Sequence, residues 1–310
     1  GQHVGIDRAG QGRQRSDAGR LNLPNSQEIR PKKVWRKVDG VLLLDKPLGL
    51  SSNDALQKAR RLFSAAKGGH TGTLDPLATG LLPLCFGEAT KFSADLLDAD
   101  KTYEAEIRLG VTTDSGDAEG QIIATAPAAV TAADMARVLP AFMGDILQVP
   151  PMHAALKRDG KPLYKLARKG VEAPAKVKRM EISLAETLDV SLPFVSFRVA
   201  CSSGTYIRSL AHSLGTRLGC GAVLTELTRE YSHPFGLDVA RDPADFTADP
   251  TLLPGCVRPI AEALPHWRKV DLTPDEAARV RNGIAVPCRP EAPAQAEAPE
   301  QGATDAEPAE

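Results

Sequence analysis

The sequence is poor in aromatic residues, has few cysteines and contains no long hydrophobic run. Its five cysteines are widely spaced, with no C-x-x-C pair and no histidine at a metal-ligand interval, so we expect reduced, mostly structural cysteines and no metal site. The longest apolar runs, such as Val41 to Leu44, fall far short of the roughly 20 residues that a membrane helix needs. The N-terminal stretch is polar and bears arginines without an apolar segment, which predicts neither a signal peptide nor an anchor and therefore a cytoplasmic protein.

The two common phosphate-binding loops are missing as well. The segment from Gly68 to Phe92 is rich in Gly, Thr, Asp and Pro, as such a loop would be. It has neither the G-x-x-x-x-G-K-[ST] spacing of a P-loop nor the G-x-G-x-x-G spacing of a dinucleotide site. A nucleotide cofactor bound by this segment is therefore excluded.

The composition is that of a globular protein with strongly segregated charge. The 310 residues, 42% hydrophobic and 25% charged, suit one large domain or a main domain with a smaller companion. The net charge of −1 conceals a basic segment at 153–180, with nine Lys/Arg against two acids, and an acidic one at 288–310, with one against six. A basic segment in a balanced chain is typical of a protein that binds a phosphate backbone, although a solvated face is the commoner cause.

Hydrophobic periodicity predicts a mixed α and β chain. We expect a buried strand at Val41–Leu44, which is continuously apolar. We also expect strands at Tyr103–Leu109 and Val195–Cys201, because both alternate apolar and polar residues. Capping residues and apolar stripes predict four helices: one begins near Ser51 and buries Ala55, Leu56, Ala59, Leu62 and Phe63, one follows Thr131, one spans Ile207–Leu218 before Gly219, and a short one follows Thr273. The fold class is therefore α+β, with a mainly antiparallel sheet and helices inserted between its strands.

One carboxylate stands in a stiff setting. Asp75 lies between Leu74 and Pro76, where the proline removes one N–H and restricts Asp75 to an extended conformation. An Asp before a Pro is usually only a turn element, so the pair alone does not indicate chemistry.

The motifs around Asp75 resemble a known family. The segment from Gly69 to Gly80 reads G-H-T-G-T-L-D-P-L-A-T-G and closely resembles the active-site signature of the TruB family of bacterial tRNA pseudouridine synthases. The resemblance extends from about Gly40 to Gly236. Further motifs occur in the family's order: D-G-V-L-L-L-D-K-P-x-G-x-S-S-N at Asp39–Asn53, K-T-Y-E-A at Lys101–Ala105, G-D at Gly116–Asp117, Q-V-P-P at Gln148–Pro151, G-x-x-x-Y-x-x-A-R-x-G at Gly160–Gly170 and G-T-Y-I-R-S-L at Gly204–Leu210.

The resemblance implies the pseudouridine synthase fold and isomerisation of uridine 55 in the T-loop of tRNA, with base flipping and without a cofactor, a metal or a guide RNA. It places Asp75 as the catalytic carboxylate, whether nucleophile or base. It pairs Asp75 with Arg208, since an ionised Asp in a dry pocket needs a cation, and it places Tyr103 against the target uracil.

Other residues match the family's substrate-binding positions. Tyr206 and Leu227 match pocket-lining residues, His70 matches a residue that stacks into the RNA, and Lys46 matches one that supports the active-site loop. The basic segment matches an inserted RNA clamp of the family. The resemblance therefore implies that six basic side chains contact RNA phosphates: Lys157, Arg158, Lys161, Lys165, Arg168 and Lys169.

These inferences give a domain plan. We expect a disordered basic extension at 1–33, a catalytic domain at 34–250 with the clamp at about 150–180, a small RNA-binding appendage, shorter than usual, at 251–287, and a disordered acidic tail at 288–310. We expect a monomer that binds tRNA and needs no protein partner or membrane.

Two alternatives and one departure stay open. A dyskerin-like enzyme shares the G-x-L-D-P core but works with a guide RNA, and an RNA-folding helper would need no catalysis. The inserted basic segment favours the stand-alone enzyme over the dyskerin type. Thr228 to His233 replace the family's usual Arg-Arg-Thr-Arg, which puts some phosphate contacts there in doubt.

Overall fold

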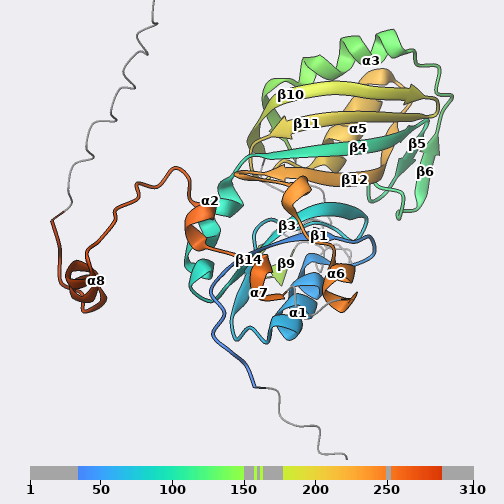
Figure 1. Ribbon diagram of the computed structural model, residues 1–310. Helices are drawn as coiled ribbons and strands as arrows, with labels where there is room; N and C mark the ends of the chain where they lie inside the picture. Colours follow the sequence, from blue (N-terminus) through green and yellow to red (C-terminus); the bar gives the residue numbers. More distant parts are fainter. Residues whose placement is uncertain (1–33, 150–156, 159–160, 163–176, 249–252, 288–310) are drawn as a thin grey trace, which may run out of the picture. The chain divides into compact units, whose positions relative to one another are not determined.

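One mixed sheet organises the chain (Figure 1). The computed structural model describes residues 34–149, 157–158, 161–162, 177–248 and 253–287. Within these ranges ten strands form one sheet in the order β14-β1-β3-β12-β4-β11-β10-β7, with β13 beside β12 and β2 beside β3. Its strands are β1 (Gly40–Lys46), β2 (Gly68–His70), β3 (Ala78–Phe86), β4 (Lys101–Leu109), β7 (Gly144–Gln148), β10 (Lys178–Ser191), β11 (Phe194–Cys201), β12 (Ala222–Ser232), β13 (Phe235–Gly236) and β14 (Val257–Arg258).

The pairing is antiparallel throughout this sheet except between β12 and β3, which run parallel. The predicted α+β class with a mainly antiparallel sheet is therefore confirmed. Two small hairpins join β5 (Val111–Thr113) to β6 (Ile122–Thr125) and β8 (Lys157–Arg158) to β9 (Lys161–Pro162).

Helices connect the strands, and local capping explains where several begin and end. The main helices are α1 (Ser52–Phe63), α2 (Ser93–Asp98), α3 (Ala132–Val138), α5 (Ile207–Leu218), α6 (Pro243–Ala248), α7 (Leu253–Cys256) and α8 (Pro274–Arg281). Short 3-10 helices are η1 (Gly87–Phe92), η2 (Leu139–Phe142), η3 (Leu237–Val239) and η5 (Ile260–Ala263). Ser51 caps α1, Thr131 and Thr273 form capping boxes on α3 and α8, and Gly219 ends α5 in the left-handed conformation, all as predicted. One prediction for α1 is wrong: Leu62 is 40% exposed because it lies at the edge of the buried stripe.

The two halves of the sheet are buried differently. Strands β1 and β3 are covered on both faces: Val41 and Leu43 join a small cluster with Leu81, whereas Leu42 and Leu44 join the main core. Because successive side chains of a strand point to opposite faces, two-sided burial explains their uninterrupted apolar sequences. In Figure 1, α5 lies behind β10, β11, β4 and β12, where these strands bury one face.

The opposite face of that half is charged. There Arg198 on β11 forms ion pairs with Glu104, Glu186 and Glu230 from three other strands. The alternating sequences of β4 and β11 follow from this one-sided burial.

Residues near the C-terminal end of the described chain add to the same sheet. Strand β14 pairs with β1, and Ala263 packs in the cluster with Val41. The first part of the predicted appendage thus packs on the catalytic domain, while the domain boundaries stay predictions. The predicted extension and acidic tail lie outside the described residues.

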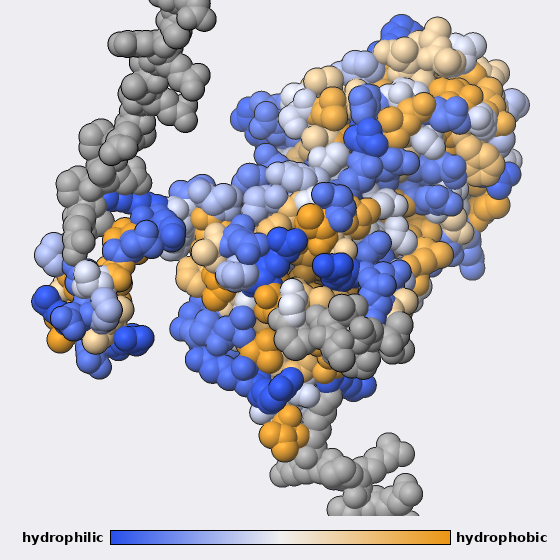
Figure 2. Space-filling model, viewed as in Figure 1, coloured by the Kyte–Doolittle hydropathy of each residue, from blue (hydrophilic) through white to orange (hydrophobic). Residues whose placement is uncertain are grey.

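Hydrophobic residues on the viewed surface are interspersed with hydrophilic ones (Figure 2). No helix in the described part of the chain is long and apolar enough to cross a membrane. No disulfide joins the described cysteines. Cys85, Cys201 and Cys220 are buried, as predicted for structural cysteines, and burial raises the pKa of Cys85 to about 11.

Candidate active site

Asp75 lies in a turn between β2 and β3 that is held from several sides. The Ser52 hydroxyl at the start of α1 accepts a hydrogen bond from the Leu74 N–H at 2.7 Å and donates one to the Leu74 carbonyl at 2.9 Å. The Ala78 N–H donates to the Asp75 carbonyl at 3.0 Å, and Arg229 donates to the Gly72 carbonyl at 3.2 Å. The turn is shorter than the predicted loop from Gly68 to Phe92, because Gly68–His70 belong to β2 and Ala78–Phe86 to β3.

A cavity of about 430 Å³ opens beside this turn, which is within the usual size range of small-ligand sites. Its lining comes from six parts of the sequence that the fold brings together. They are the turn itself, Leu97 and Asp98 of α2, Lys101 and Tyr103 of β4, Ser203–Arg208 before and in α5, and Leu224, Leu227 and Arg229 of β12; Lys178 completes it.

Arg208 forms the predicted ion pair with Asp75. The guanidinium is also 3.2 Å, from Nη1 to Oδ2, from Asp117, whose side chain is only 7% exposed. Asp117 is oriented in turn by the Ser115 hydroxyl and the Glu119 N–H, at 2.5 and 3.2 Å. One arginine therefore bridges a buried carboxylate and the half-exposed Asp75.

The role of Asp117 was not predicted, although the Gly116–Asp117 motif was noticed. The Leu224 N–H donates a hydrogen bond to the Gly116 carbonyl at 3.2 Å, so β12 holds the turn that places Asp117 beside Arg208. This contact joins residues far apart in the sequence, so no local pattern reveals it. A second unpredicted contributor is Gln148 at the end of β7. Its amide exchanges two hydrogen bonds, of 2.8 and 3.0 Å, with the backbone of Tyr206 and so fixes the segment before α5.

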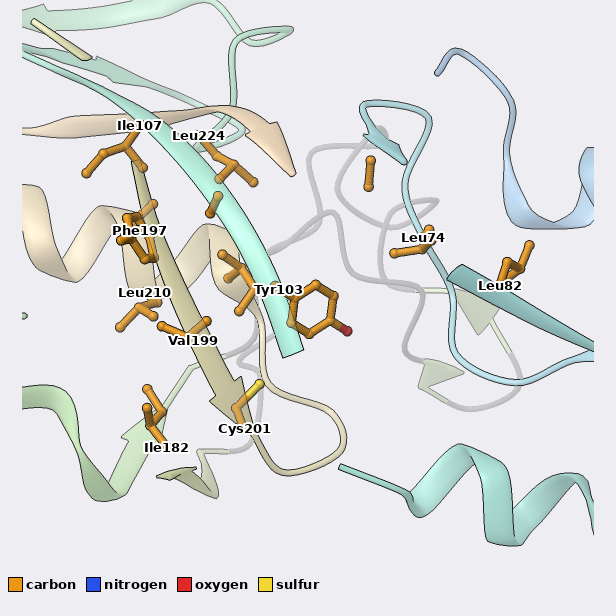
Figure 3. Close-up of a cluster of buried hydrophobic side chains, with 14 of the residues drawn as sticks. Leu74, Leu82, Tyr103, Ile107, Ile182, Phe197, Val199, Cys201, Leu210 and Leu224 are labelled. Carbon is orange, nitrogen blue, oxygen red and sulfur yellow. The ribbon is translucent and has the colours of Figure 1, made fainter. Parts of the chain in front are cut away.

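Two tyrosines line the cavity as expected. Figure 3 shows Tyr103 at the edge of the core cluster, with its hydroxyl pointing away from Phe197 and Val199. Burial raises the pKa of Tyr103, and the charge of Arg229 opposes that rise. Burial, followed by the charge of Asp75, also raises the pKa of Tyr206. Both phenols are therefore neutral hydrogen-bond donors near neutral pH. Leu227 of β12 adds an apolar side chain to the same cavity lining.

Lys46 and His70 lie close to the turn but do not line the cavity. Lys46 is fully buried and donates to the Pro47 and Leu50 carbonyls at 3.0 and 2.6 Å; the adjoining Gly49 N–H donates to Pro76 at 2.8 Å. This geometry suits the predicted supporting role. His70 ends strand β2 instead of lying in a loop, and its buried Nδ1 has no partner within the described chain. Burial and the nearby Arg229 charge lower its pKa, which favours the neutral ring.

Little can be placed in the predicted clamp. Lys157 and Arg158 form β8 and Lys161 begins β9, while Lys165, Arg168 and Lys169 lie outside the described residues. Among the described residues no group of His, Cys, Asp and Glu is arranged to hold a metal ion.

Comparisons with known proteins agree with this geometry. The model of "TruB family pseudouridylate synthase (N terminal domain)" matches residues 60–207. The solved structure titled "Crystal Structure of a Cbf5-Nop10-Gar1 Complex" matches with a TM-score of 0.62 at 29% identity, over 79% of this chain and 67% of that one. The fold and the aspartate–arginine pocket thus define a pseudouridine synthase.

Curated relatives narrow the class. A tRNA pseudouridine synthase B from Dechloromonas aromatica is 67% identical over 198 residues, which is 64% of this chain and 66% of the relative. Another, from Nitratidesulfovibrio vulgaris Hildenborough, is 55% identical over 254 residues, or 81% of this chain and 83% of the relative. The chain belongs to the TruB family of tRNA pseudouridine synthases, isomerases that make pseudouridine 55 in the T-loop.

Proposed function

We propose that the Asp75 cavity isomerises uridine 55 of free tRNA to pseudouridine, without a guide RNA. The observation that carries this proposal is the pairing of Asp75 with Arg208 at the rim of a cavity lined by Tyr103 and Leu227. The C1′–N1 bond of the nucleotide breaks, the uracil turns, and C5 joins C1′; the proton lost from C5 is balanced by one gained at N1. No oxidant or reductant is needed.

The cavity residues divide this work by chemistry. Asp75 acts at the sugar as nucleophile or base, and Arg208 holds its carboxylate by an ion pair. Tyr103 presents an aromatic face and a phenol to the flipped uracil, with Tyr206 and Leu227 completing its walls. His70 and Lys46 act outside the cavity, the first toward the RNA and the second on the Asp75 turn.

The stand-alone reaction is favoured over the guide-dependent one. The Cbf5 complex shares the fold, but relatives at 55–67% identity are tRNA pseudouridine synthase B enzymes. The intact Asp75–Arg208 pair favours catalysis over a purely RNA-folding role. The cytoplasmic location and the monomeric state stay predictions.

The test is a pseudouridine map. Unmodified tRNA incubated with the purified chain alone should gain one pseudouridine, at position 55, and the same tRNA with cytidine at position 55 should gain none. A product that appears only with added guide RNA would support the dyskerin-like alternative. Faster tRNA folding without product would support the folding helper.

RNA binding by the basic segment has its own test. Replacing Lys165, Arg168 and Lys169 by alanine should weaken tRNA binding at moderate salt and hardly at all near 1 M. Each lost phosphate contact should reduce the slope of log affinity against log salt by about 0.7 where the RNA is single-stranded. An unchanged slope would contradict the clamp while leaving the enzyme assignment intact.

A further inference from the structure

Arg229 is a buried cation that the reaction scheme above does not use. It lies on β12, is 0% exposed and forms no ion pair with an acidic side chain of the described chain. Its Nε donates to the Leu81 carbonyl at 2.7 Å and its Nη2 to the Gly72 carbonyl at 3.2 Å. Backbone carbonyls compensate only part of the several kcal/mol that desolvating a charge costs, roughly, so stability alone does not favour an arginine here.

The guanidinium supports the turn that carries Asp75. Gly72 has a φ of +92°, and a Cβ at this position would lie 3.1 Å from Arg229 Nη1 and 3.3 Å from Lys101 Cε. The turn therefore packs directly against the guanidinium, and the lack of a side chain at Gly72 allows this close approach. Asp75 follows three residues later, so a shift of Arg229 moves the carboxylate.

The same guanidinium reaches the tyrosine expected to contact uracil. Arg229 and Tyr103 are register partners in the β12–β4 pair. Register partners point to the same face of a sheet, and both side chains line the cavity. The charge of Arg229 also opposes the effect of burial on the Tyr103 pKa. Arg229 thus lies between Gly72, on the side of the carboxylate, and Tyr103, on the side of the base.

We propose that Arg229 is a positioning residue for the isomerisation, whose planar fork sets the Tyr103 hydroxyl at a fixed distance from the Asp75 turn. This inference rests on the proposed function of the cavity. Because its side chain is fully buried, Arg229 does not reach an RNA backbone, which agrees with the doubt about phosphate contacts in the segment from Thr228 to His233. A lysine keeps the charge but not the fork, and a methionine keeps the volume but neither.

The test compares Arg229→Lys and Arg229→Met with Arg198→Lys. Arg198 lies on the same sheet but pairs with glutamates on its outer face, away from the cavity, so its lysine variant is a matched control. We expect the single-turnover rate of both Arg229 variants to fall at least about tenfold while the Kd for tRNA changes less than about threefold. Arg198→Lys should behave like the parent.

Thermal unfolding separates positioning from stability. Arg229→Met removes a buried charge but also the donors to the Leu81 and Gly72 carbonyls, so the two effects on Tm oppose each other. At a temperature at which Arg229→Met is fully folded, it should still be slow. Parent-like turnover by Arg229→Met, or a rate that falls only with the folded fraction, would overturn the proposal. In NMR spectra of protein carrying ¹³Cζ-tyrosine, Arg229→Met should shift the Tyr103 resonance, assigned with Tyr103→Phe, and leave that of Tyr206 in place.

The failure of each idea has its own signature. If the parent makes no pseudouridine in tRNA, the proposed function fails, and the NMR comparison still reports on Arg229 and Tyr103. If the parent and Arg198→Lys are active and the Arg229 variants match them, only the inference about Arg229 fails.

Discussion

Two arginines line one cavity and are bound by different kinds of partner. Arg208 lies between two carboxylates, Asp75 and Asp117, and keeps 13% of its side chain exposed. Arg229 is fully buried and held by backbone carbonyls. The carboxylate-bound arginine holds the reacting group by an ion pair, whereas the carbonyl-bound arginine holds the turn and lies beside Tyr103. Changes on the Arg208 side should therefore act on chemistry, and changes on the Arg229 side on geometry and stability.

The largest effect is expected for Asp75→Asn, which removes the reacting charge without changing size. Product formation should fall more than about a thousandfold, or about 4 kcal/mol, while the affinity for tRNA stays within about tenfold. Arg208 keeps Asp117 as a partner, so the fold should survive. Single-turnover assays and filter binding check both halves, and near-normal turnover would remove Asp75 from its assigned role.

Arg208→Lys should have the next largest effect. A point charge on a flexible stem cannot hold Asp75 and Asp117 together as the planar fork does. We expect a rate loss of about tenfold to a thousandfold, or about 1.4 to 4 kcal/mol. Full activity of this variant across neutral pH would break the distinction between the two arginines.

Asp117→Asn should be milder, because it loosens Arg208 without touching Asp75. We expect a rate loss of about tenfold, or about 1.4 kcal/mol, with unchanged tRNA affinity. Asp114→Asn in the same turn is the matched control, since Asp114 accepts a hydrogen bond from the Gln121 N–H and forms no ion pair with Arg208. Equal losses in the two variants would mean that the turn, and not the Asp117 charge, matters.

Local signals explain why much of the fold could be predicted from sequence. The caps of α1, α3 and α8 depend on residues three apart, and the alternation in β4 and β11 reports one-sided burial within each strand. The Asp75–Arg208 pair was accessible only because its two motifs resemble a family; the residues are 133 positions apart.

Long-range register explains what could not be predicted. The parallel pairing of β12 with β3 places Arg229 beside Gly80, and Gly72 rests on its side chain, although these residues are about 150 apart in sequence. Nothing local marks Arg229 as buried, since its strand also carries Glu226 and Glu230. The same holds for Gln148, whose contact with Tyr206 spans 58 positions.

Lys101 is the second cation beside the Asp75 turn, and its predicted effect is on stability. Lys101 is 5% exposed, and its Nζ donates to the Leu97 and Ala99 carbonyls at 2.9 and 2.5 Å. Burial, followed by the charge of Arg229, lowers its pKa to about 8. Between about pH 8 and the ordinary pKa of about 10.4, the unfolded chain therefore binds a proton that the folded chain lacks, so stability rises with pH in this window.

Below pH 8 Lys101 is charged in both states, and the cost of burying its charge is fully present. Raising the pH from 8 to 10 should therefore stabilise the parent relative to Lys101→Met by about 1 to 2 kcal/mol, as measured by urea unfolding at each pH. Lys91→Met is the control because Lys91 is exposed and its pKa is raised by Glu88, so its difference from the parent should stay flat over the same range. A flat difference for Lys101→Met would mean that this lysine keeps its proton up to its ordinary pKa. In that case burial of the Lys101 charge would cost the folded chain no stability, and the two sides of the cavity would not differ in this respect.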